Sequence, residues 1–600
     1  MRLTGGEIIA EYLIRERVPY VFALPGHGCL GLVDAFLGRE QKVRLIQVKQ
    51  EMAGVHMADA FYRVTGRPLA VVTSIGPGAI NTAIGAASAY VDSIPVLIIT
   101  GGAHTYLRGK GLLQEIERGH DADFQRLLHP VVKRCWRVDS VGQLPGIIHR
   151  AFNLMLTGRR GPVLIELPMD VQCDAAEVKL PEPRTRAPHG RVLGDPAEIA
   201  RAAKLLQAAK RPVILAGGGV AAAGAQEELK KLAELLGAAV ITTLMGKGTF
   251  PEDHPLYAWH AGSKGTTCGN LLASRSDVLL AVGCRFADET ASSYRHGVSF
   301  AIPPTRLIHV DLDPGEIGKN YPVEVGIVGD ARAVLHALHH ELKNTLRYRD
   351  YLRQPYFAEI LELKQKWLAS VRKLQASNRI PVTISRALKE IRDFLRPDAF
   401  VVTSSGNVQA QVLQEFPFFV PGTCVTAGGF STMGYSVPAA LGVKLAHPGR
   451  QVIALVGDGD FMMSMQEMST AVQYGLNAVF AVFNNAGWMA IKDLQMSAYG
   501  LDRAMATDFL DSRGKLYSPD FKQAALAFGL WAEKVSRPRQ IQPALKRAFA
   551  AKKPALLEII VNRDYPDSGS PAVGWWDVPV PAYLKERRKK YERERKGEKL

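Results

Sequence analysis

Short runs of apolar and β-branched residues alternate along the chain with longer stretches in which apolar residues recur every three or four positions. The short runs predict buried strands, and the longer stretches, such as 197–209 and 225–236, predict amphipathic helices. The predicted strands include 69–73, 96–100, 213–216, 278–282, 307–310, 452–456 and 478–483. Because strands that alternate with helices are typical of parallel sheets covered by helices, the sequence predicts an α/β protein.

Two interruptions of this pattern divide the chain. Residues 180–196 are rich in proline and polar residues, as linkers are, and residues 340–380 are charged with few strand signals. We therefore expect three doubly wound parallel-sheet domains and a C-terminal lid or tail, at about 1–180, 190–345, 380–562 and 563–600. The first and third domains are alike in size and layout.

Composition supports a folded protein without a membrane part. The chain has 600 residues, 47% apolar and 22% charged, which is too long for one hydrophobic core. No apolar stretch reaches the roughly 18 residues that a membrane helix needs, and no signal-peptide core is visible. Six scattered cysteines form no C-x-x-C pair, which argues against a disulfide framework or a zinc knuckle. We expect a cytoplasmic protein.

The net charge of +16 is partly local. Residues 585–600 hold nine Lys or Arg and four Glu, a net of +5, so the rest of the chain is only mildly basic. No helix-turn-helix, zinc finger or aromatic-basic RNA signature accompanies this charge. The balance favours an anionic small molecule over nucleic acid as the partner.

The strongest chemical signal follows two predicted strands. The run 452–456 is followed by Gly457-Asp458-Gly459-Asp460, and the run 478–483 by Asn484-Asn485-Ala486-Gly487. Because ligands of parallel sheets bind at the carboxyl ends of strands, both polar clusters are expected at one edge. Asp458 and Asn485 offer the hard oxygens that Mg²⁺ takes when diphosphate oxygens complete its shell.

These residues resemble the metal-diphosphate motif of thiamine diphosphate (ThDP) enzymes, and the flanking sequence resembles the acetolactate-synthase-like branch of that family. The stretch 428–440 is similar to the family's segment whose methionine holds the cofactor in a bent form. The likeness extends to about residue 562 and implies a pyrimidine-binding domain, a central Rossmann-like domain and a diphosphate-binding domain. It implies metal ligands at Asp458, Asn485 and Gly487, and cofactor contacts at Pro25, Gly26, Gly76, Asn81, Gly406, Asn407, Val408, Ser431, Met433, Gly457, Gly459, Asp460 and Trp488.

Residues 47–63 are similar to the family's glutamate segment, at the end of a strand and the start of a helix. The resemblance implies that Glu51 bonds the aminopyrimidine of ThDP and promotes loss of the proton from its reactive carbon. On its own, a glutamate that opens a helix is usually a capping or helix-dipole residue. Residues 73–81 would form the glycine turn beside the pyrimidine.

Two further catalytic candidates lie in loops. His27 belongs to a loop that in relatives faces the reacting carbon, where it would donate a proton; the alternative is a surface histidine. Gln114 belongs to a segment that resembles the family's Phe-Gln-Glu substrate segment, although Leu113 replaces the phenylalanine. The alternative for Gln114 is an ordinary polar loop.

The chain departs from the acetolactate synthase pattern at two places. In the central domain, Ala287 and Glu289 replace an aspartate and an arginine of the family's FAD-binding pattern, so FAD, ADP and an empty nucleotide site all stay open. After the predicted metal site, Lys492 and Leu494 stand where the family has an apolar residue and a tryptophan. A Trp-Trp pair at 575–576 forms either part of a lid over the pocket or a core anchor for the last segment.

The sequence thus predicts a Mg²⁺- and ThDP-dependent carboligase or lyase acting on a 2-oxo acid, with FAD or ADP as a further candidate cofactor. In the family, the residues corresponding to Glu51 and Asp458 belong to different subunits, which implies a homodimer or homotetramer. A 2-hydroxyacyl-CoA lyase or oxalyl-CoA decarboxylase, acting on an acyl-CoA thioester, is the alternative. A flavin or nicotinamide oxidoreductase would account for the central domain but not for the paired first and third domains.

Overall fold

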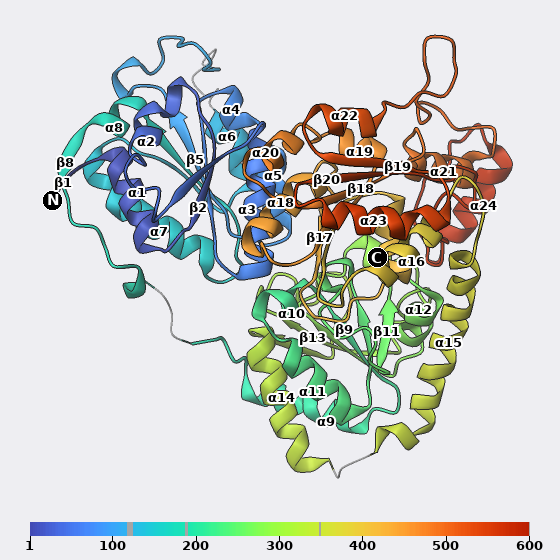
Figure 1. The fold of residues 1–600 in the computed structure, drawn as a ribbon. Helices are drawn as coiled ribbons and strands as arrows, with labels where there is room; N and C mark the ends of the chain where they lie inside the picture. The colour runs from blue at the N-terminus through green and yellow to red at the C-terminus, as the bar shows by residue number, and fades with distance from the viewer. Residues whose placement is uncertain (117–123, 187–189, 347–349, 599–600) are drawn as a thin grey trace.

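The computed structural model describes residues 1–116, 124–186, 190–346 and 350–598. Three six-stranded sheets, each entirely parallel, form three lobes. The N-terminal and C-terminal lobes lie side by side, and the central lobe lies below them (Figure 1). The predicted α/β class with three doubly wound parallel sheets is confirmed. Each sheet falls inside one predicted domain, while the domain boundaries themselves stay a prediction.

The N-terminal sheet has the order β3-β2-β4-β5-β7-β6. Its central strands β4, β5 and β7 are buried on both faces, which is why they read as continuous apolar runs. The strands are β2 (Tyr20–Leu24), β3 (Arg44–Gln47), β4 (Ala70–Thr73), β5 (Leu97–Gly102), β6 (Cys135–Arg137) and β7 (Val163–Pro168). The α-helices are α1 (Gly5–Arg15), α2 (Leu30–Asp34), α3 (Glu51–Thr65), α4 (Pro77–Ile80), α5 (Ala83–Val91), α6 (Phe124–Leu128), α7 (Leu144–Leu156) and α8 (Met169–Cys173), and β1 (Arg2–Thr4) pairs with β8 (Ala175–Glu177).

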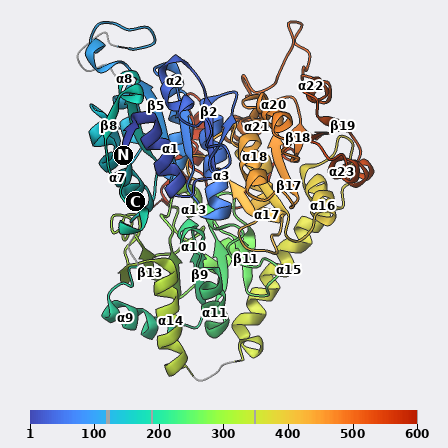
Figure 2. The ribbon, with the colours of Figure 1, turned by 60° about the vertical axis from the view of Figure 1, so that its left-hand side comes forward.

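The central sheet has the order β11-β10-β9-β12-β13-β14. Its strands are β9 (Pro212–Ala216), β10 (Ala239–Thr242), β11 (Tyr257–His260), β12 (Val278–Val282), β13 (Arg306–Asp311) and β14 (Val325–Val328). Its helices are α9 (Pro196–Ala208), α10 (Gly218–Ala223), α11 (Gln226–Leu236), α12 (Thr267–Ser274), α13 (Asp288–Ala291) and α14 (Ala331–Thr345). The predicted charged connector contains α15 (Pro355–Gln375), which runs along the molecule from the central lobe to the C-terminal lobe (Figure 2).

The C-terminal sheet has the order β16-β15-β17-β18-β20-β19. This order repeats that of the N-terminal sheet strand for strand, which confirms the likeness that the sequence suggested between these two domains. The strands are β15 (Phe400–Thr403), β16 (Cys424–Thr426), β17 (Val452–Gly457), β18 (Val479–Asn484), β19 (Trp531–Val535) and β20 (Ala555–Ile560). The helices are α16 (Ile384–Phe394), α17 (Asn407–Glu415), α18 (Ser436–Ala446), α19 (Asp458–Met462), α20 (Glu467–Gln473), α21 (Met489–Tyr499), α22 (Phe521–Ala527), α23 (Ile541–Ala550) and α24 (Lys585–Arg595).

The N-terminal and C-terminal lobes meet along α3 and α18. A Cβ atom at Gly442 would lie 2.3 Å from the carbonyl oxygen of Met57, so the two helices pack backbone to backbone at that point. The same core cluster contains buried residues of both lobes. Among the described residues, no helix is both long and apolar enough to span a membrane.

Candidate active site

Glu51 lies at the carboxyl edge of the N-terminal sheet, as the first residue of α3 after β3. Its side chain is buried, and Asn81 Nδ2 donates a hydrogen bond to its Oε2 at 3.0 Å. A Cβ at Gly78 would lie 3.1 Å from the other carboxylate oxygen, so the glycine turn passes directly beside it. Gln50 is the N-cap of α3 and makes no side-chain capping bond. The Glu51 carboxylate therefore faces the turn 78–81.

The loops after β2 and β4 also meet at this edge. Gly28 N–H donates to Ser74 Oγ at 3.2 Å, and a Cβ at Gly26 would lie 2.6 Å from the same hydroxyl. Gly76 has a positive φ of 52°, and a Cβ there would lie 1.8 Å from the carbonyl oxygen of Gln114. Gln114 and the predicted glycine turn are thus in direct contact.

His27 and Gln114 are exposed at this edge, as is Pro25. His27 begins a short 3₁₀ turn after β2 and Gly26. The structure places all three beside the turn that faces Glu51, which leaves both interpretations of His27 and Gln114 open to experiment.

Asp458 lies at the carboxyl end of β17 and begins α19. Its Oδ2 accepts hydrogen bonds from the backbone N–H groups of Asn485 at 3.0 Å and Ala486 at 2.6 Å, and its Oδ1 accepts one from Gly459 at 2.8 Å. Burial raises the pKa of this carboxyl, and the backbone donors oppose that rise. The two clusters that the sequence predicted at one edge are therefore hydrogen-bonded to each other.

The donor set at this edge fits Mg²⁺. One carboxylate (Asp458), one amide side chain (Asn485) and the carbonyl of Gly487 supply only oxygens, the ligand type that Mg²⁺ prefers. Within the described ranges no group of three or more His, Cys, Asp and Glu side chains could hold a metal. A cation here would therefore complete its shell with oxygens from phosphate or water.

Asp460 and Trp488 lie at the same edge of the C-terminal sheet as Asp458. The Asp460 carboxylate accepts hydrogen bonds from Ser404 Oγ and from the N–H of Gly434. Burial raises its pKa to about 6. A Cβ at Gly459 would lie 2.3 Å from the Trp488 ring, so the indole lies directly on this glycine. Gly457 ends β17 just before the aspartate.

The N-terminus of α17 offers backbone N–H groups at the same edge. Gly406 precedes α17 with φ 101° and gives it no side-chain cap, which leaves N–H groups of the first turn to bind an anion such as a phosphate. The Val408 side chain lies in the hydrophobic core, so this residue offers only its backbone. Asn407 Nδ2 donates to Asp493 Oδ2 at 2.8 Å and to the carbonyl of Ser568 at 3.2 Å, and its amide is therefore already bound within the protein.

Ser431 and Met433 lie in the segment before α18. Ser431 has a positive φ of 50°, and its Oγ donates to Ser405 Oγ at 3.0 Å. Met433 is partly exposed, with 38% of the residue's surface accessible. Both residues thus stand beside the loop that follows β15.

Lys492 and Asp493 are both partly buried, and each contacts a residue outside α21. Lys492 Nζ lies 2.8 Å from Asp508 Oδ1, an oxygen that Arg563 also contacts. Asp493 Oδ1 accepts a hydrogen bond from Ser568 Oγ at 2.8 Å. Asp493 therefore fastens Ser568 to α21, whereas Lys492, one of the two departures from the family pattern, shares Asp508 with Arg563.

The rest of the C-terminal segment contacts the central domain. Gly574 N–H donates to the carbonyl of Ser263 at 3.2 Å, and Asp577 N–H to Ser293 Oγ at 3.0 Å. Trp575 Nε1 donates to Glu598 Oε1 at 2.8 Å. Trp576 is 39% exposed, so it is not a core anchor. A lid role for this segment stays a prediction.

The glycines at the switch point of the central sheet and the residues 285–289 after β12 contact different parts of the molecule. Gly217 and Gly283 pack backbone to backbone where β9 and β12 end, at the switch point of the central sheet. Arg285 points to Gly429, where a Cβ would lie 2.6 Å from its Nη2. Phe286 packs edge-to-face on His309 in a buried aromatic cluster. Glu289 lies 3.4 Å from His260.

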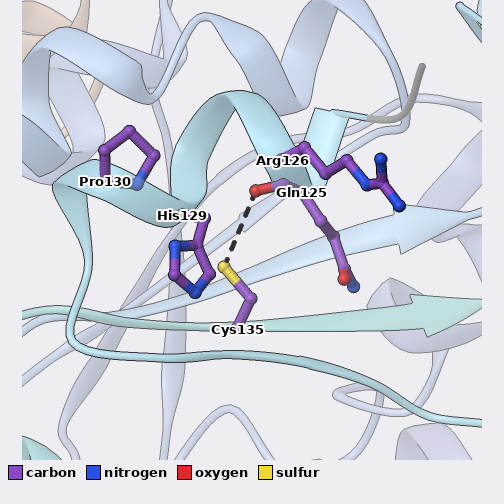
Figure 3. Close-up of a pocket in the computed structure, with 5 residues that line it drawn as sticks. All are labelled: Gln125, Arg126, His129, Pro130 and Cys135. Atoms are coloured by element: carbon purple, nitrogen blue, oxygen red, sulfur yellow. Dashed lines mark hydrogen bonds between the residues drawn. The ribbon is translucent and has the colours of Figure 1, made fainter. Parts of the chain in front are cut away.

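An open cavity of about 320 Å³ lies elsewhere in the N-terminal domain (Figure 3). It is lined by Gln125, Arg126, His129, Pro130 and Cys135. The Cys135 thiol donates to the carbonyl of Gln125 at 3.9 Å. None of the predicted site residues lines this cavity, so it is separate from the candidate active site.

Sequence reasoning missed three residues that shape the candidate site. Ser404 bonds Asp460, Ser405 bonds Ser431, and Asp493 bonds Asn407. The two serines follow the strand β15, and that position was the available signal for them. Asp493 carried no signal, because its partners lie 86 and 75 residues away in the chain.

Comparison with known proteins agrees with this arrangement. Three family models match the chain: the N-terminal TPP binding domain of thiamine pyrophosphate enzymes at residues 3–122, the central domain at 199–338, and the C-terminal TPP binding domain at 404–559. The chain therefore belongs to the thiamine pyrophosphate (ThDP) enzymes, and it is an enzyme of the ThDP-dependent carboligase type.

Within that family the chain resembles acetolactate synthases. It is 36% identical over 570 residues to a probable acetolactate synthase large subunit of Methanocaldococcus jannaschii, covering 93% of this chain and 92% of the relative. It is 35% identical over 574 residues to the acetolactate synthase large subunit of Corynebacterium glutamicum (94% and 87%). It is 32% identical over 552 residues to the acetolactate synthase isozyme 3 large subunit of Escherichia coli K12 (91% and 92%).

Proposed function

We propose that this chain is a Mg²⁺- and ThDP-dependent enzyme that joins or cleaves carbon–carbon bonds of a 2-oxo acid. The observation that carries the proposal is the hydrogen bonding of Asp458 to the backbone of residues 485–486, which brings this carboxylate and the loop of Asn485 and Gly487 together at one sheet edge. The names of the relatives, acetolactate synthases, support a 2-oxo acid as the substrate class.

Each half of the site has a distinct task in this proposal. Asp458, Asn485 and the carbonyl of Gly487 would hold Mg²⁺, and N–H groups at the start of α17 would bind a diphosphate. When bound, ThDP supplies a nucleophilic carbon and an electron sink. Glu51, oriented by the amide of Asn81, would bond the aminopyrimidine of ThDP and move a proton to and from it.

A second copy of the chain would complete the site. Glu51 bonds within the N-terminal domain and Asp458 within the C-terminal domain. Exposed apolar side chains in both halves support this proposal, because a partner would cover them: Leu30 (60%) and Leu113 (82%) near His27 and Gln114, and Phe430 (43%) and Met463 (40%) near Met433 and Asp460. We propose a homodimer as the smallest active unit.

The acyl-CoA alternative loses one of its supports. Lys492 is one of the two residues that change the predicted pocket, but its ammonium group is paired with Asp508 and is therefore not free for an anionic substrate. The other departure is Leu494, which stands where the family has a tryptophan. It does not decide whether the pocket takes a large substrate. A 2-oxo acid is therefore the preferred substrate class, and a CoA thioester is the alternative that the experiment below separates.

The central domain offers residues for an adenine nucleotide. Residues 217–219 lie at the switch point of the sheet, where a nucleotide's phosphates bind in doubly wound folds. FAD and ADP both contain an adenosine diphosphate group, so these residues do not distinguish the two. Extraction of the nucleotide, followed by absorbance near 450 nm for a flavin, decides between them.

The proposal is tested by turnover in parallel with pyruvate and with a 2-hydroxyacyl-CoA, each with ThDP and Mg²⁺. Acetolactate from pyruvate supports the proposal, whereas cleavage of the bond between C1 and C2 of the 2-hydroxyacyl-CoA, to an aldehyde or ketone and formyl-CoA, supports the alternative. Turnover that does not need ThDP would overturn both.

Glu51→Gln is the matching variant. We expect it to lower kcat by about a hundredfold or more, because the amide cannot hold the proton that a carboxylate takes up. Glu166→Gln changes another buried carboxylate of the same sheet, which bonds Arg137, and should keep activity. Equal activity of the Glu51 variant and the wild type would contradict the assigned role.

A further inference from the structure

A buried carboxylate joins two domains beside the candidate site. Asp92 follows α5 in the N-terminal domain, and its side chain is 0% exposed. It accepts hydrogen bonds from the N–H of Gly428 and the N–H of Gly429, both at 2.9 Å. Arg63 Nη2 donates to it at 2.8 Å. Asp92 thus binds two consecutive amides of the C-terminal domain and one guanidinium of its own domain.

The two glycines are required at this contact. A Cβ at Gly428 would lie 2.1 Å from Met245 Sδ and 2.2 Å from the Asp92 carboxylate. A Cβ at Gly429 would lie 2.6 Å from Arg285 Nη2. All three lobes of the molecule therefore converge on the start of the segment 428–434.

The far end of that segment is held by a second carboxylate. The N–H of Gly434 donates to Asp460, which follows β17 beside the candidate metal site. Between the two anchors lie Ser431, whose φ is positive, and the partly exposed Met433. The segment is therefore fixed at one end by the N-terminal domain and at the other by the C-terminal domain.

Arg63 links Asp92 and the segment 428–434 to the helix that begins at Glu51. Both residues belong to α3, where Glu51 is the first residue and Arg63 lies near the end. Arg63 also pairs with Asp59, at 2.6 Å, and Asp59 accepts a hydrogen bond from Tyr435 OH at 2.6 Å. Tyr435 directly follows Gly434. The helix α3 thus carries Glu51 at its start and, further along, Asp59 and Arg63, which contact Tyr435 and Asp92.

We infer that Asp92 and Arg63 are positioning residues: they fix the place of Met433 in the half of the site that also contains Asp458. This inference rests on the proposed function, because Met433 acts only if a cofactor lies beside it. Charge-assisted bonds to two successive amides, made without water, give the segment one fixed position. Without the carboxylate, the buried Arg63 loses a partner and two amides lose their acceptor.

The test is a double-mutant cycle on kcat with Asp92→Asn and Met433→Ala. If Asp92 acts through the segment, Asp92→Asn lowers kcat by about tenfold or more in the wild type, and by less than about threefold when Met433 is already alanine. The KM for the 2-oxo acid should change far less than kcat. Arg63→Lys, which keeps the charge but loses the second donor, should show a smaller effect of the same kind.

Glu252→Gln is the control. Glu252 is also a buried carboxylate that joins two domains, through Lys247 and the N–H of Phe418, but it does not contact the segment 428–434. Any loss that it causes should be the same with and without the Met433→Ala substitution. Additive effects of Asp92→Asn and Met433→Ala would overturn the inference, as would unchanged kcat in both Asp92→Asn and Arg63→Lys.

The proposed function and the role of Asp92 and Arg63 can be contradicted separately. Absence of ThDP binding to the wild type, measured by calorimetry with Mg²⁺, contradicts the proposed function. If the wild type binds ThDP and turns over, but the effects of Asp92→Asn and Met433→Ala on kcat are additive, only the positioning role of Asp92 and Arg63 is contradicted. If Asp92→Asn does not fold, the cycle is measured with Arg63→Lys instead, and additivity there overturns the inference.

Discussion

At the scale of single residues, burial controls the charge of several carboxyl groups. Glu415, the last residue of α17, is buried, which raises its pKa to about 7. Its carboxyl accepts a hydrogen bond from Ser385 Oγ at 2.7 Å. The pKa of Asp460 is raised to about 6 for the same reason. Such groups stabilise the fold in their neutral form and oppose it when ionised.

The variant Glu415→Gln tests this account. The folded pKa of about 7 lies above the ordinary value of 4.5, so the stability from the neutral group is fully present below pH 4.5 and is lost as the pH rises through 7. We expect the variant to be less sensitive to pH between about 5 and 8, by up to about 3 kcal/mol. Thermal unfolding at a series of pH values measures this, with the exposed Glu586→Gln as the control. A parallel pH profile of wild type and variant would contradict the assigned pKa.

At the scale of elements, the close packing of α3 and α18 holds the two lobes that carry the candidate site. Gly442 allows this approach, because a Cβ would lie 2.3 Å from a backbone oxygen of α3. The helix α3 begins at Glu51, and α18 begins at Ser436. A shift of α3 would therefore move Glu51, and a shift of α18 would move the segment before Ser436. Small residues at this contact are therefore a requirement of the site as well as of the fold.

Gly442→Ala should destabilise the protein although alanine favours helices. Ala in place of Gly inside a helix normally adds about 1 kcal/mol, but here the clash with Met57 reverses the sign, with an expected loss of about 1–3 kcal/mol. Gly146→Ala in α7 is the matched control, since nothing lies within 4 Å of its Cβ, and it should be neutral or stabilising. Chemical denaturation compares the two; a stabilised Gly442→Ala would show that the helices are not in contact.

The elements were largely predictable from the sequence. The predicted strands 69–73, 278–282 and 452–456 correspond to β4, β12 and β17 within one residue, because buried parallel strands form continuous apolar runs. Asp458 and Asn485 were placed together because both follow such strands. The bond between Asp92 and Gly428 could not be predicted, because it joins residues 336 positions apart and depends on how the lobes pack.

At the scale of the whole molecule, buried polar contacts hold the central lobe to the C-terminal lobe. Lys247 and Glu252 form an ion pair of 2.7 Å with both side chains 0% exposed, and Glu252 also accepts the N–H of Phe418. The C-terminal segment adds contacts at Asp493 and Ser293. The three lobes are thus fastened to one another, and a second copy would add the remaining half of each site.

The central claim is that Glu51 of one copy and Asp458 of another form one ThDP site. The most direct test is to co-express Glu51→Gln and Asp458→Asn chains with different tags and to purify the mixed dimer. Each variant alone should be inactive, whereas the mixed dimer has one intact site and should recover about half of the wild-type kcat. A mixed dimer that is as inactive as either variant would contradict the claim.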